Sequence, residues 1–308
     1  MLIGLDIGGT KIEGVLLESN TLNLIERIRM ETPKTNYQDF LERVEHVIDS
    51  LSKDKKALSI GIGCCGSVDE QTGLMKGANI QYLNGEAFLL DLEKIYPVPI
   101  EISNDANCLA ISEFKTGAAK TAKSSCVAII IGTGCGSGII ANGGIIEGLN
   151  GLGGEIGHNP LPHYSEDKDG KAEQCYCGSA NCIESFVSGT GFERVYALKH
   201  TPLKAVDIFI NAKNGDENAM AHIELYCDQL ARVIGSIVNV IDPEVFILGG
   251  GVSNQDIIYP ILQGKLKKYT FSKSIRTKII KAKHGDSSGV IGAAMLPLIK
   301  KTIKQSIK

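Results

Sequence analysis

A cluster of cysteines with a nearby histidine is the segment of this chain best suited to chemistry. Cys175, Cys177 and Cys182 lie within eight residues, and His158 precedes them. Three thiolates and one imidazole form the ligand set of a tetrahedral zinc site, and four protein ligands leave no open position for a catalytic water. The residue types and their spacing therefore predict a structural zinc ion.

Other interpretations of this segment stay open. A CxC pair followed by one cysteine is less specific for zinc than two CxxC pairs, and buried free thiols are common in protein cores. His163 is an alternative to His158 as the fourth ligand.

Two glutamates flank the cysteines. Glu155 stands three residues before His158, so a helical turn would place both side chains on one face. Glu184 follows Cys182 by two residues. A metal that fixes the histidine and the cysteines would also fix these carboxylates. We therefore expect the zinc to hold a polar binding site in place.

Two glycine-rich turns follow short apolar runs, at 6–11 (DIGGTK) and at 132–138 (GTGCGSG). Glycines let backbone N–H groups approach phosphate oxygens, and a carboxylate such as Asp6 suits magnesium, bound through water. Either turn alone is equally consistent with an ordinary tight hairpin. Two such loops in matching positions favour phosphate binding, which is not of the P-loop type because the chain has no Walker A sequence.

Two further polar loops follow strand-like runs. Asn104 and Asp105 precede a helical run, and an isolated pair of this kind is most simply a helix N-cap. At the end of a strand, however, Asp105 would face the crevice where ligands bind in α/β sheets, ionised by the helix N-terminus and ready to accept a hydroxyl proton. The loop 61–66 fits GxGxxG, but a turn-like stretch follows it, so we expect contact with a small polar ligand rather than a dinucleotide.

Composition limits the classes of function. A net charge of −3 and a pI near 6.1 give no electrostatic footprint for nucleic acid. The lysines near the end, at 300, 301, 304 and 308, are expected on the solvated face of a last helix. Nine cysteines are an odd number, and three are better used as ligands, so we expect a reducing cytoplasm without disulfides. We recognise no signal peptide and no run long enough to cross a membrane.

The elements that must position these residues alternate between strands and helices, which predicts an α/β fold. We expect strands at 2–5, 12–17, 59–63, 99–102 and 245–248, and helices at 37–51 and 221–241. The strand–turn–strand pattern of 4–17 returns at 127–140, which indicates a duplicated domain with a boundary near 117–125.

Together the motifs resemble the ROK family of bacterial sugar kinases and repressors, within the actin-like ATPase superfamily. The resemblance covers nearly the whole chain and rests on DIGGTK at 6–11, NDAN at 104–107, GTGCGSG at 132–138, GGEIGH at 153–158, CYCGSANCIE at 175–184 and LGGG at 248–251. It is closest to fructokinases at 82–85 (YLNG), 158–162 (HNPLP) and 283–289 (KHGDSSG).

The resemblance implies a two-domain actin-like ATPase (ribonuclease H-like) fold with a duplicated α/β core and a central cleft. The implied domains are 1–118 with the sugar and phosphate loops, 119–286 with the second phosphate loop, the zinc loop and the adenosine site, and 287–308, a C-terminal helix that packs back on the first domain. A cytoplasmic homodimer is what the family suggests.

The implied activity is an ATP-dependent hexose kinase that converts D-fructose to fructose 6-phosphate, with Asp105 as general base. The other sugar contacts would be Gly66, Asn104, Glu155, His158 and Glu184. His158 would also bind Zn²⁺ with the three cysteines. ATP and Mg²⁺ would be held by Asp6, Gly8, Gly9, Thr10, Lys11, Gly132, Thr133, Gly134 and Gly136, and the adenosine by Gly249, Gly250 and Gly251. The partners would be the sugar and ATP, without nucleic acid or membrane.

Alternatives within the resemblance are an N-acetylglucosamine or N-acetylmannosamine kinase and a broad glucose/mannose kinase. A sugar-sensing repressor is disfavoured, because the first hairpin starts at residue 2 and leaves no room for a helix-turn-helix domain. Two departures bear on the site: Cys64 and Cys65 replace the Ile-Pro usual in the sugar loop, and Asn181 replaces the glycine usual before the last cysteine.

Overall fold

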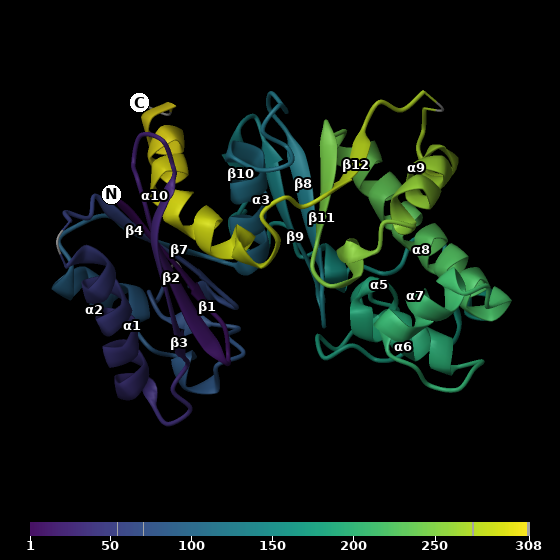
Figure 1. Ribbon diagram of the computed structural model, residues 1–308, viewed down its shortest axis with the longest axis horizontal. Coiled ribbons are helices and arrows are strands. Elements are labelled where there is room, and N and C mark those ends of the chain that lie inside the picture. Colours follow the sequence, from purple (N-terminus) through teal and green to yellow (C-terminus); the bar gives the residue numbers. More distant parts are fainter. Residues whose placement is uncertain (54, 70, 273, 307–308) are drawn as a thin grey trace. The chain divides into compact units, whose positions relative to one another are not determined.

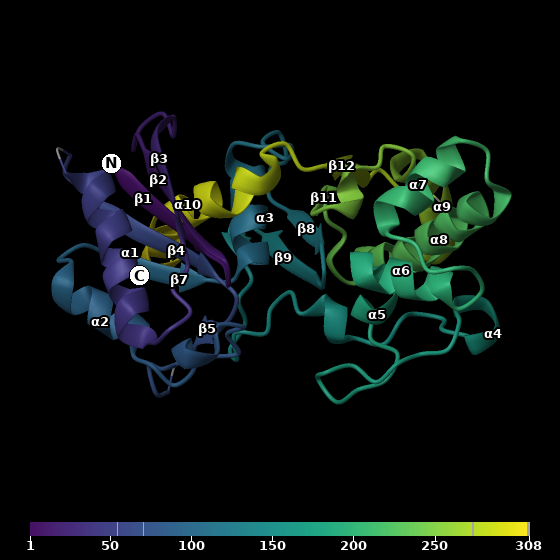
Figure 2. The same cartoon turned by 60° about the horizontal axis from the view of Figure 1, so that its bottom comes forward.

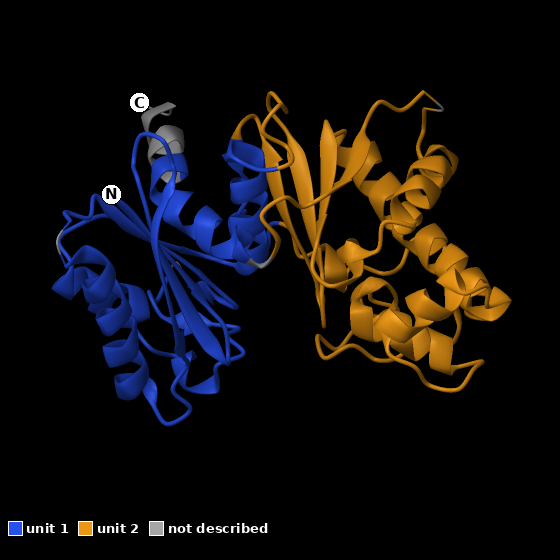
Figure 3. Cartoon of the chain, in the orientation of Figure 1, with its two compact units in different colours: residues 1–117, 144–153, 286–308 blue, residues 118–143, 154–285 orange. Residues whose placement is uncertain are grey.

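The computed structural model describes residues 1–53, 55–69, 71–272 and 274–306 (Figure 1), and the side chains of Asp286 and of residues 300–306 lie outside this description. The expected solvated lysine face therefore falls outside the described residues. The chain forms two compact units (Figure 3). Unit 1 comprises residues 1–117, 144–153 and 286–308, and unit 2 comprises residues 118–143 and 154–285.

Unit 1 is built on a mixed sheet. Its strands lie in the order β3 (Leu24–Glu31), β2 (Lys11–Leu17), β1 (Leu2–Ile7), β4 (Ser59–Cys64) and β7 (Ile100–Ser103). The first three strands are antiparallel, while β1, β4 and β7 run parallel. The predicted hairpin 2–17 is therefore confirmed. Two short strands, β5 (Ser67–Val68) and β6 (Met75–Lys76), form a separate ribbon, followed by the turn η1 (Gln81–Leu83).

Helices cover both faces of this sheet. Helix α1 (Tyr37–Ser52) begins where the Asn36 side chain accepts a hydrogen bond from the Asp39 N–H, and with α2 (Phe88–Ile95) it packs on the face that carries Ile3 and Leu5 (Figure 2). The opposite face carries Leu2, Val15 and Leu17 and contacts α10 (Ser288–Ser306). Successive side chains of β1 thus alternate between two separate hydrophobic cores, one on each face of the sheet.

Helix α10 packs closely on the sheet of unit 1 and on α3 at positions occupied by glycine. A methyl group on Gly61 would lie 1.7 Å from the Ala293 carbonyl oxygen, and one on Gly4 would lie 2.3 Å from the Val290 carbonyl oxygen. Within α10, a methyl group on Gly292 would lie 1.8 Å from the Cys108 carbonyl oxygen of α3 (Asp105–Lys115). Backbone atoms cannot give way as a flexible side chain can, so these glycines set the packing of α10 between the sheet and α3.

Unit 2 repeats the same beginning. Strands β9 (Cys135–Ala141) and β8 (Cys126–Ile131) form an antiparallel hairpin, and β11 (Val245–Gly249) and β12 (Lys278–Lys281) extend it in parallel. Its helices are α4 (Glu166–Asp169), α5 (Glu184–Val187), α6 (Gly189–Ala197), α7 (Ala205–Lys213), α8 (Glu217–Ile241) and α9 (Ile258–Tyr269). The predicted duplication is confirmed, because each sheet joins a hairpin to parallel strands.

Helix α8 starts earlier than the predicted residue 221. Asp216 caps it by accepting the Ala219 N–H at 3.0 Å, and it ends at Asp242, whose backbone is left-handed. Along the described residues, no helix combines the length and the apolar character needed to cross a membrane.

The glycine packing of α10 gives a stability prediction. Gly61→Ala should lower the free energy of unfolding by about 2–3 kcal/mol or more, because the added methyl group overlaps the Ala293 carbonyl. Gly264→Ala in α9 is the matched control. A methyl group there meets nothing within 4 Å, so that change should be neutral or stabilise by up to about 1 kcal/mol. Urea unfolding measures both, and equal effects would contradict the packing argument.

Candidate functional site

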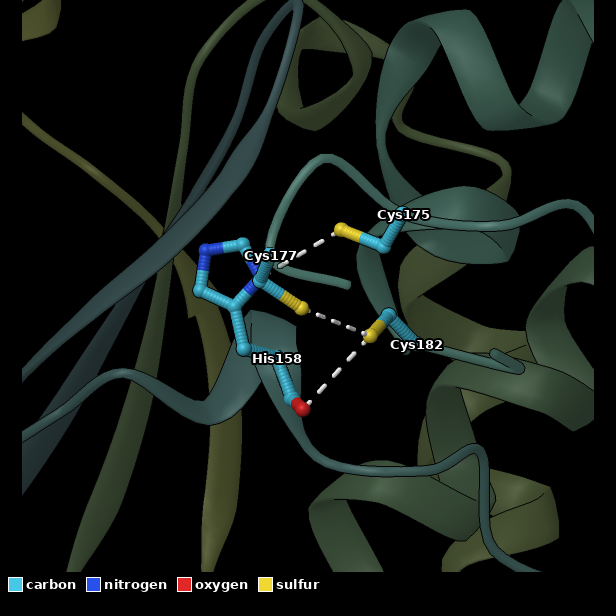
Figure 4. Close-up of side chains that lie close together, drawn as sticks. All are labelled: His158, Cys175, Cys177 and Cys182. Carbon is cyan, nitrogen blue, oxygen red and sulfur yellow. Dashed lines mark hydrogen bonds between the residues drawn. The ribbon is translucent and has the colours of Figure 1, made fainter. Parts of the chain in front are cut away.

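The predicted metal ligands come together in unit 2 (Figure 4). The ligand atoms of His158, Cys175, Cys177 and Cys182 all lie within 4.8 Å of one another. Cys175 Sγ is 3.6 Å from His158 Nδ1, and Cys177 Sγ is 3.6 Å from Cys182 Sγ. The nitrogen and sulfur donors are those that zinc prefers.

The electrostatics of the loop favour a thiolate at one position. The Ser179 backbone N–H lowers the pKa of Cys177 to about 6. Asn181, which replaces the usual glycine, has a left-handed backbone with φ of 61°, a conformation that asparagine tolerates better than most residues. The turn before the last cysteine is thus formed without glycine.

His163 lies outside the metal cluster. Its carbonyl oxygen accepts a hydrogen bond from Arg232 at 2.9 Å, as does that of Pro162 at 3.0 Å. Arg232 is buried and pairs with the buried Asp169. The buried ion pair therefore fixes the backbone that follows His158.

The other nitrogen of His158 also has a partner. Tyr176 Oη lies 2.9 Å from His158 Nε2, and the two rings meet edge to face at 5.1 Å. This hydrogen bond to Tyr176 orients the imidazole, and Nε2 would be its donor if Nδ1 bound a metal ion.

Glu155 and His158 bracket a single turn, η2 (Ile156–His158). The segment 154–158, which we call the strap, packs directly on β9. A methyl group on Gly157 would lie 2.1 Å from the Cys135 carbonyl oxygen, and Ser137 Oγ donates to the Gly154 carbonyl at 2.7 Å. The strap that carries the predicted sugar contacts therefore rests on the strand that leaves the second glycine loop.

A cavity of about 650 Å³ opens beside the second glycine loop in unit 2. Of the predicted ATP residues, Gly132, Thr133 and Gly251 line it. The lining residues that sequence analysis missed include Gly189, Thr190, Glu193, Lys204 and Phe209. The glycine-rich run 188–191 (SGTG), four residues after Glu184, was the available signal for the first two.

Residues of this cavity wall form hydrogen bonds with the second glycine loop and hold it in place. Gly189 N–H donates to the Gly132 carbonyl at 2.7 Å, and Thr190 Oγ1 donates to the Thr133 carbonyl at 2.6 Å. Gly249 ends β11, and Gly250 follows with φ of 84° against the Ile131 backbone. Gly134 is next to the Glu184 carboxylate, while Gly136 lies within β9.

In unit 1, α3 begins at the predicted catalytic residues. Asn104 Oδ1 accepts the Asn107 N–H at 2.7 Å, so Asn104 is the N-cap. Asp105 Oδ1 accepts the Ala106 N–H at 2.8 Å. Asp105 as a whole residue is exposed, yet protein atoms crowd its carboxyl, and this desolvation raises the pKa of that group.

Asp6 is electrostatically linked to Asp105. Burial, followed by the charges of Asp105 and Glu13, raises the pKa of Asp6 to about 6, and Lys11 opposes the rise. Glu13 is fully buried and pairs with Arg29 at 2.6 Å and with Lys11 at 3.5 Å. A cation near Asp6 and Asp105 would relieve the repulsion between these two carboxylates.

The first glycine loop is tied down at Gly8. Its N–H donates to the Lys11 carbonyl at 2.9 Å, and its carbonyl accepts from Thr32 Oγ1 at 2.6 Å. Gly9 and Thr10 are exposed. The loop thus presents its tip to solvent from a fixed base.

The predicted sugar loop requires glycine at one position. Gly66 has φ of 114°, and a methyl group there would lie 2.9 Å from both the Lys76 carbonyl and the Ala78 nitrogen. Cys64 is buried, which raises the pKa of its thiol to about 12, whereas Cys65 is exposed. Burial therefore keeps the Cys64 thiol protonated and unreactive.

The predicted sugar residues fall on both units. Gly66, Asn104 and Asp105 belong to unit 1, and Glu155, His158 and Glu184 belong to unit 2. Unit 1 thus contains the candidate base, and unit 2 contains the segment 154–158 beside the predicted metal ligands.

These features define a class of protein: an α/β phosphotransferase of the actin-like ATPase fold. The chain belongs to the ROK family, whose sequence model matches residues 2–300. It is 36% identical over 304 residues to an N-acetyl-D-glucosamine kinase of Pectobacterium atrosepticum, covering 97% of this chain and 99% of that protein. It is 36% identical over 309 residues to that of Vibrio cholerae, covering 96% and 99%. Among solved structures it is similar to the ROK hexokinase from Thermus thermophilus, with a TM-score of 0.85, 26% identity and 99% of each chain covered.

The raised pKa of Asp6 gives a pH-dependent prediction. Asp6 ionises in the folded chain at about pH 6 and in the unfolded chain near its ordinary value of 3.8. The ionised Asp6 therefore lowers the free energy of unfolding by its full amount above pH 6. Well below pH 4, where Asp6 is protonated in both states, this effect is absent. Asp6→Asn should raise the free energy of unfolding by about 1–3 kcal/mol at pH 7.5 without magnesium, and the gain should fade between pH 6 and 4.

Urea unfolding at pH 7.5 and pH 4 tests this prediction. Asp69→Asn is a control of opposite sign, because Lys76 and the Thr72 N–H lower the pKa of Asp69 to about 2. That change should lower stability at pH 7.5. An equal gain from Asp6→Asn at both pH values would show that its effect is not electrostatic.

Proposed function

We propose that this protein is an ATP-dependent hexose kinase whose acceptor is N-acetylglucosamine. The observation that carries the acceptor is the 36% identity, over nearly the full length of both chains, to N-acetyl-D-glucosamine kinases. The comparisons favour this acceptor over the fructokinase interpretation drawn from sequence motifs.

The first group in the proposed mechanism is the base. Asp105 accepts the proton of the attacking sugar hydroxyl, and its raised pKa brings it closer to the pH at which a base works. Asp6 would hold magnesium, and the charge of the ion would relieve the repulsion between Asp6 and Asp105. The glycine loops supply backbone N–H groups to the ATP phosphates, and transfer is in line.

The nucleotide is assigned to the cavity of unit 2. Its apolar wall, with Phe209 and Val252, suits a base, and Gly132 and Thr133 are at its edge. Gly249, Gly250 and Gly251 contribute the turn beside it. We assign the sugar hydroxyls to the set of Gly66, Asn104, Glu155, His158 and Glu184.

Fructose is the second candidate acceptor. The fructokinase-like stretches 82–85, 158–162 and 283–289 favour it. The acceptor pocket also differs from the usual pattern at Cys64 and Cys65, which bears on either sugar. The domain division 1–118, 119–286 and 287–308, a homodimeric state and a cytoplasmic location complete the proposal.

Zinc is the proposed structural ion at His158, Cys175, Cys177 and Cys182. The donor types, their mutual distances and the low pKa of Cys177 support it. The ion would hold the loop 175–182 against the strap 154–158 and so fix Glu155 and Glu184. It would take no part in the transfer itself.

The acceptor is tested by sugar-dependent release of ADP from MgATP. We expect the fastest turnover with N-acetylglucosamine among N-acetylglucosamine, N-acetylmannosamine, fructose, mannose and glucose. A clear preference for fructose would keep the mechanism and select the second candidate. Absence of turnover with all five sugars would contradict the proposal.

The base is tested by Asp105→Asn. The amide cannot take the hydroxyl proton, so kcat should fall by about 10²–10⁴-fold. Sugar affinity, measured by calorimetry, should change little because the amide still forms hydrogen bonds. Unchanged turnover would remove Asp105 from the mechanism.

Zinc is tested by metal analysis and thermal unfolding. The purified chain should hold about one zinc ion, and Cys177→Ser should lose it together with part of the thermal stability, since a structural zinc contributes folding free energy. Cys65→Ser, a thiol of the other unit, should keep the zinc. A zinc-free protein with unchanged stability would contradict the assignment.

A further inference from the structure

The carboxylate of Glu184 contacts the second glycine loop. Its Oε2 accepts the backbone N–H of Cys135 at 2.9 Å. A methyl group on Gly134 would lie 2.6 Å from the same oxygen. The glycine at 134 therefore makes room for this carboxylate, and the loop and the glutamate fit as a pair.

Glu184 lies close to the predicted ligand cluster along the chain. Glu184 begins α5, two residues after Cys182. Its Cβ lies 3.6 Å from where a methyl group on Gly157 would be, on the strap between Glu155 and His158. Glu184 thus stands between the strap and the glycine loop, and all three belong to unit 2.

We propose that Glu184 couples the sugar subsite to the phosphate loop. One oxygen, Oε2, holds the Cys135 N–H and with it the loop conformation. The second oxygen is the one that the acceptor hydroxyl engages. Sugar bound to Glu184 thereby fixes the carboxylate and stiffens the loop for the nucleotide. This inference rests on the proposed function for the sugar half, whereas the loop half stands on the observed contact.

The coupling must act in both directions. If sugar tightens nucleotide binding by some factor, nucleotide tightens sugar binding by the same factor. A residue that only contacts sugar would leave nucleotide affinity unchanged when no sugar is present. Sugar-free nucleotide affinity therefore separates the two roles.

The first experiment measures the Kd of MgADP by calorimetry, with and without acceptor sugar. Glu184→Ala removes the acceptor of the Cys135 N–H, so the sugar-free Kd should rise about tenfold, and the effect of sugar on it should disappear. Glu184→Gln keeps a carbonyl oxygen for the Cys135 N–H and should restore most of the sugar-free affinity. Glu155→Gln is the matched control, a change in a proposed sugar carboxylate that should weaken sugar binding and leave the sugar-free nucleotide Kd unchanged.

A second variant approaches the contact from the loop. Gly134→Ala pushes against Glu184 Oε2, which is the end of a flexible side chain, so the fold should tolerate it. Because the carboxylate is displaced, sugar affinity without nucleotide should fall several-fold, although the change lies in the phosphate loop.

Two results would overturn the inference. One is a sugar-free nucleotide Kd for Glu184→Ala within twofold of the unaltered protein. The other is unaltered sugar affinity in Gly134→Ala. If Glu184→Ala does not fold, Gly134→Ala decides. Turnover across the sugar panel tests the proposed function separately, because the sugar-free nucleotide measurement needs no acceptor.

Discussion

Helix α10 lies against the sheet of unit 1 at a distance that leaves no room for a methyl group. Gly4 and Gly61 on the strands and Gly292 on the helix meet backbone carbonyls directly. Helix α3 packs on α10 at Cys108, and Asp105 at the start of α3 is within electrostatic reach of Asp6 in β1. The raised pKa of Asp6 is one result, since burial and the charge of Asp105 are among its causes. The chemistry of unit 1 thus depends on contacts made by the last segment of the chain.

In unit 2, several kinds of contact fix one short segment, the strap 154–158. The strap 154–158 rests on β9 through Gly154 and Gly157, and its continuation is held by the buried Arg232. The ligand atoms of three thiols lie within 4.8 Å of that of His158. Packing, a buried ion pair and a ligand cluster therefore converge on one short segment, which is why its side chains can be placed without a long regular element.

Sequence patterns were sufficient for the local parts of this structure. The two hairpins followed from apolar runs around glycine turns, and the cap at Asn104 followed from its position before a helical run. The three cysteines of the ligand cluster also followed from their spacing, whereas the choice of His158 over His163 needed the structure.

What the sequence could not reveal are contacts between distant segments. The hydrogen bond from the Cys135 N–H to Glu184 joins residues 49 apart in sequence, and neither residue type predicts the other as its partner. Glu193 and Phe209 in the cavity wall look like ordinary helix residues until α6 and α7 are placed beside the loop. The motif comparison favoured fructose, while full-length identity favours an N-acetyl sugar, because hydroxyl recognition depends on few positions.

The division of unit 1 along the chain has a consequence for how the protein is made. Residues 1–117 emerge from the ribosome first, yet the helix that completes their core spans residues 288–306. The apolar face of Leu2, Val15 and Leu17 stays uncovered until α10 has been synthesised, whereas the sheet of unit 2 is complete once β12 has appeared. The sheet of unit 2 can therefore finish folding before that of unit 1, and the nascent chain carries an exposed apolar strand face until α10 has appeared.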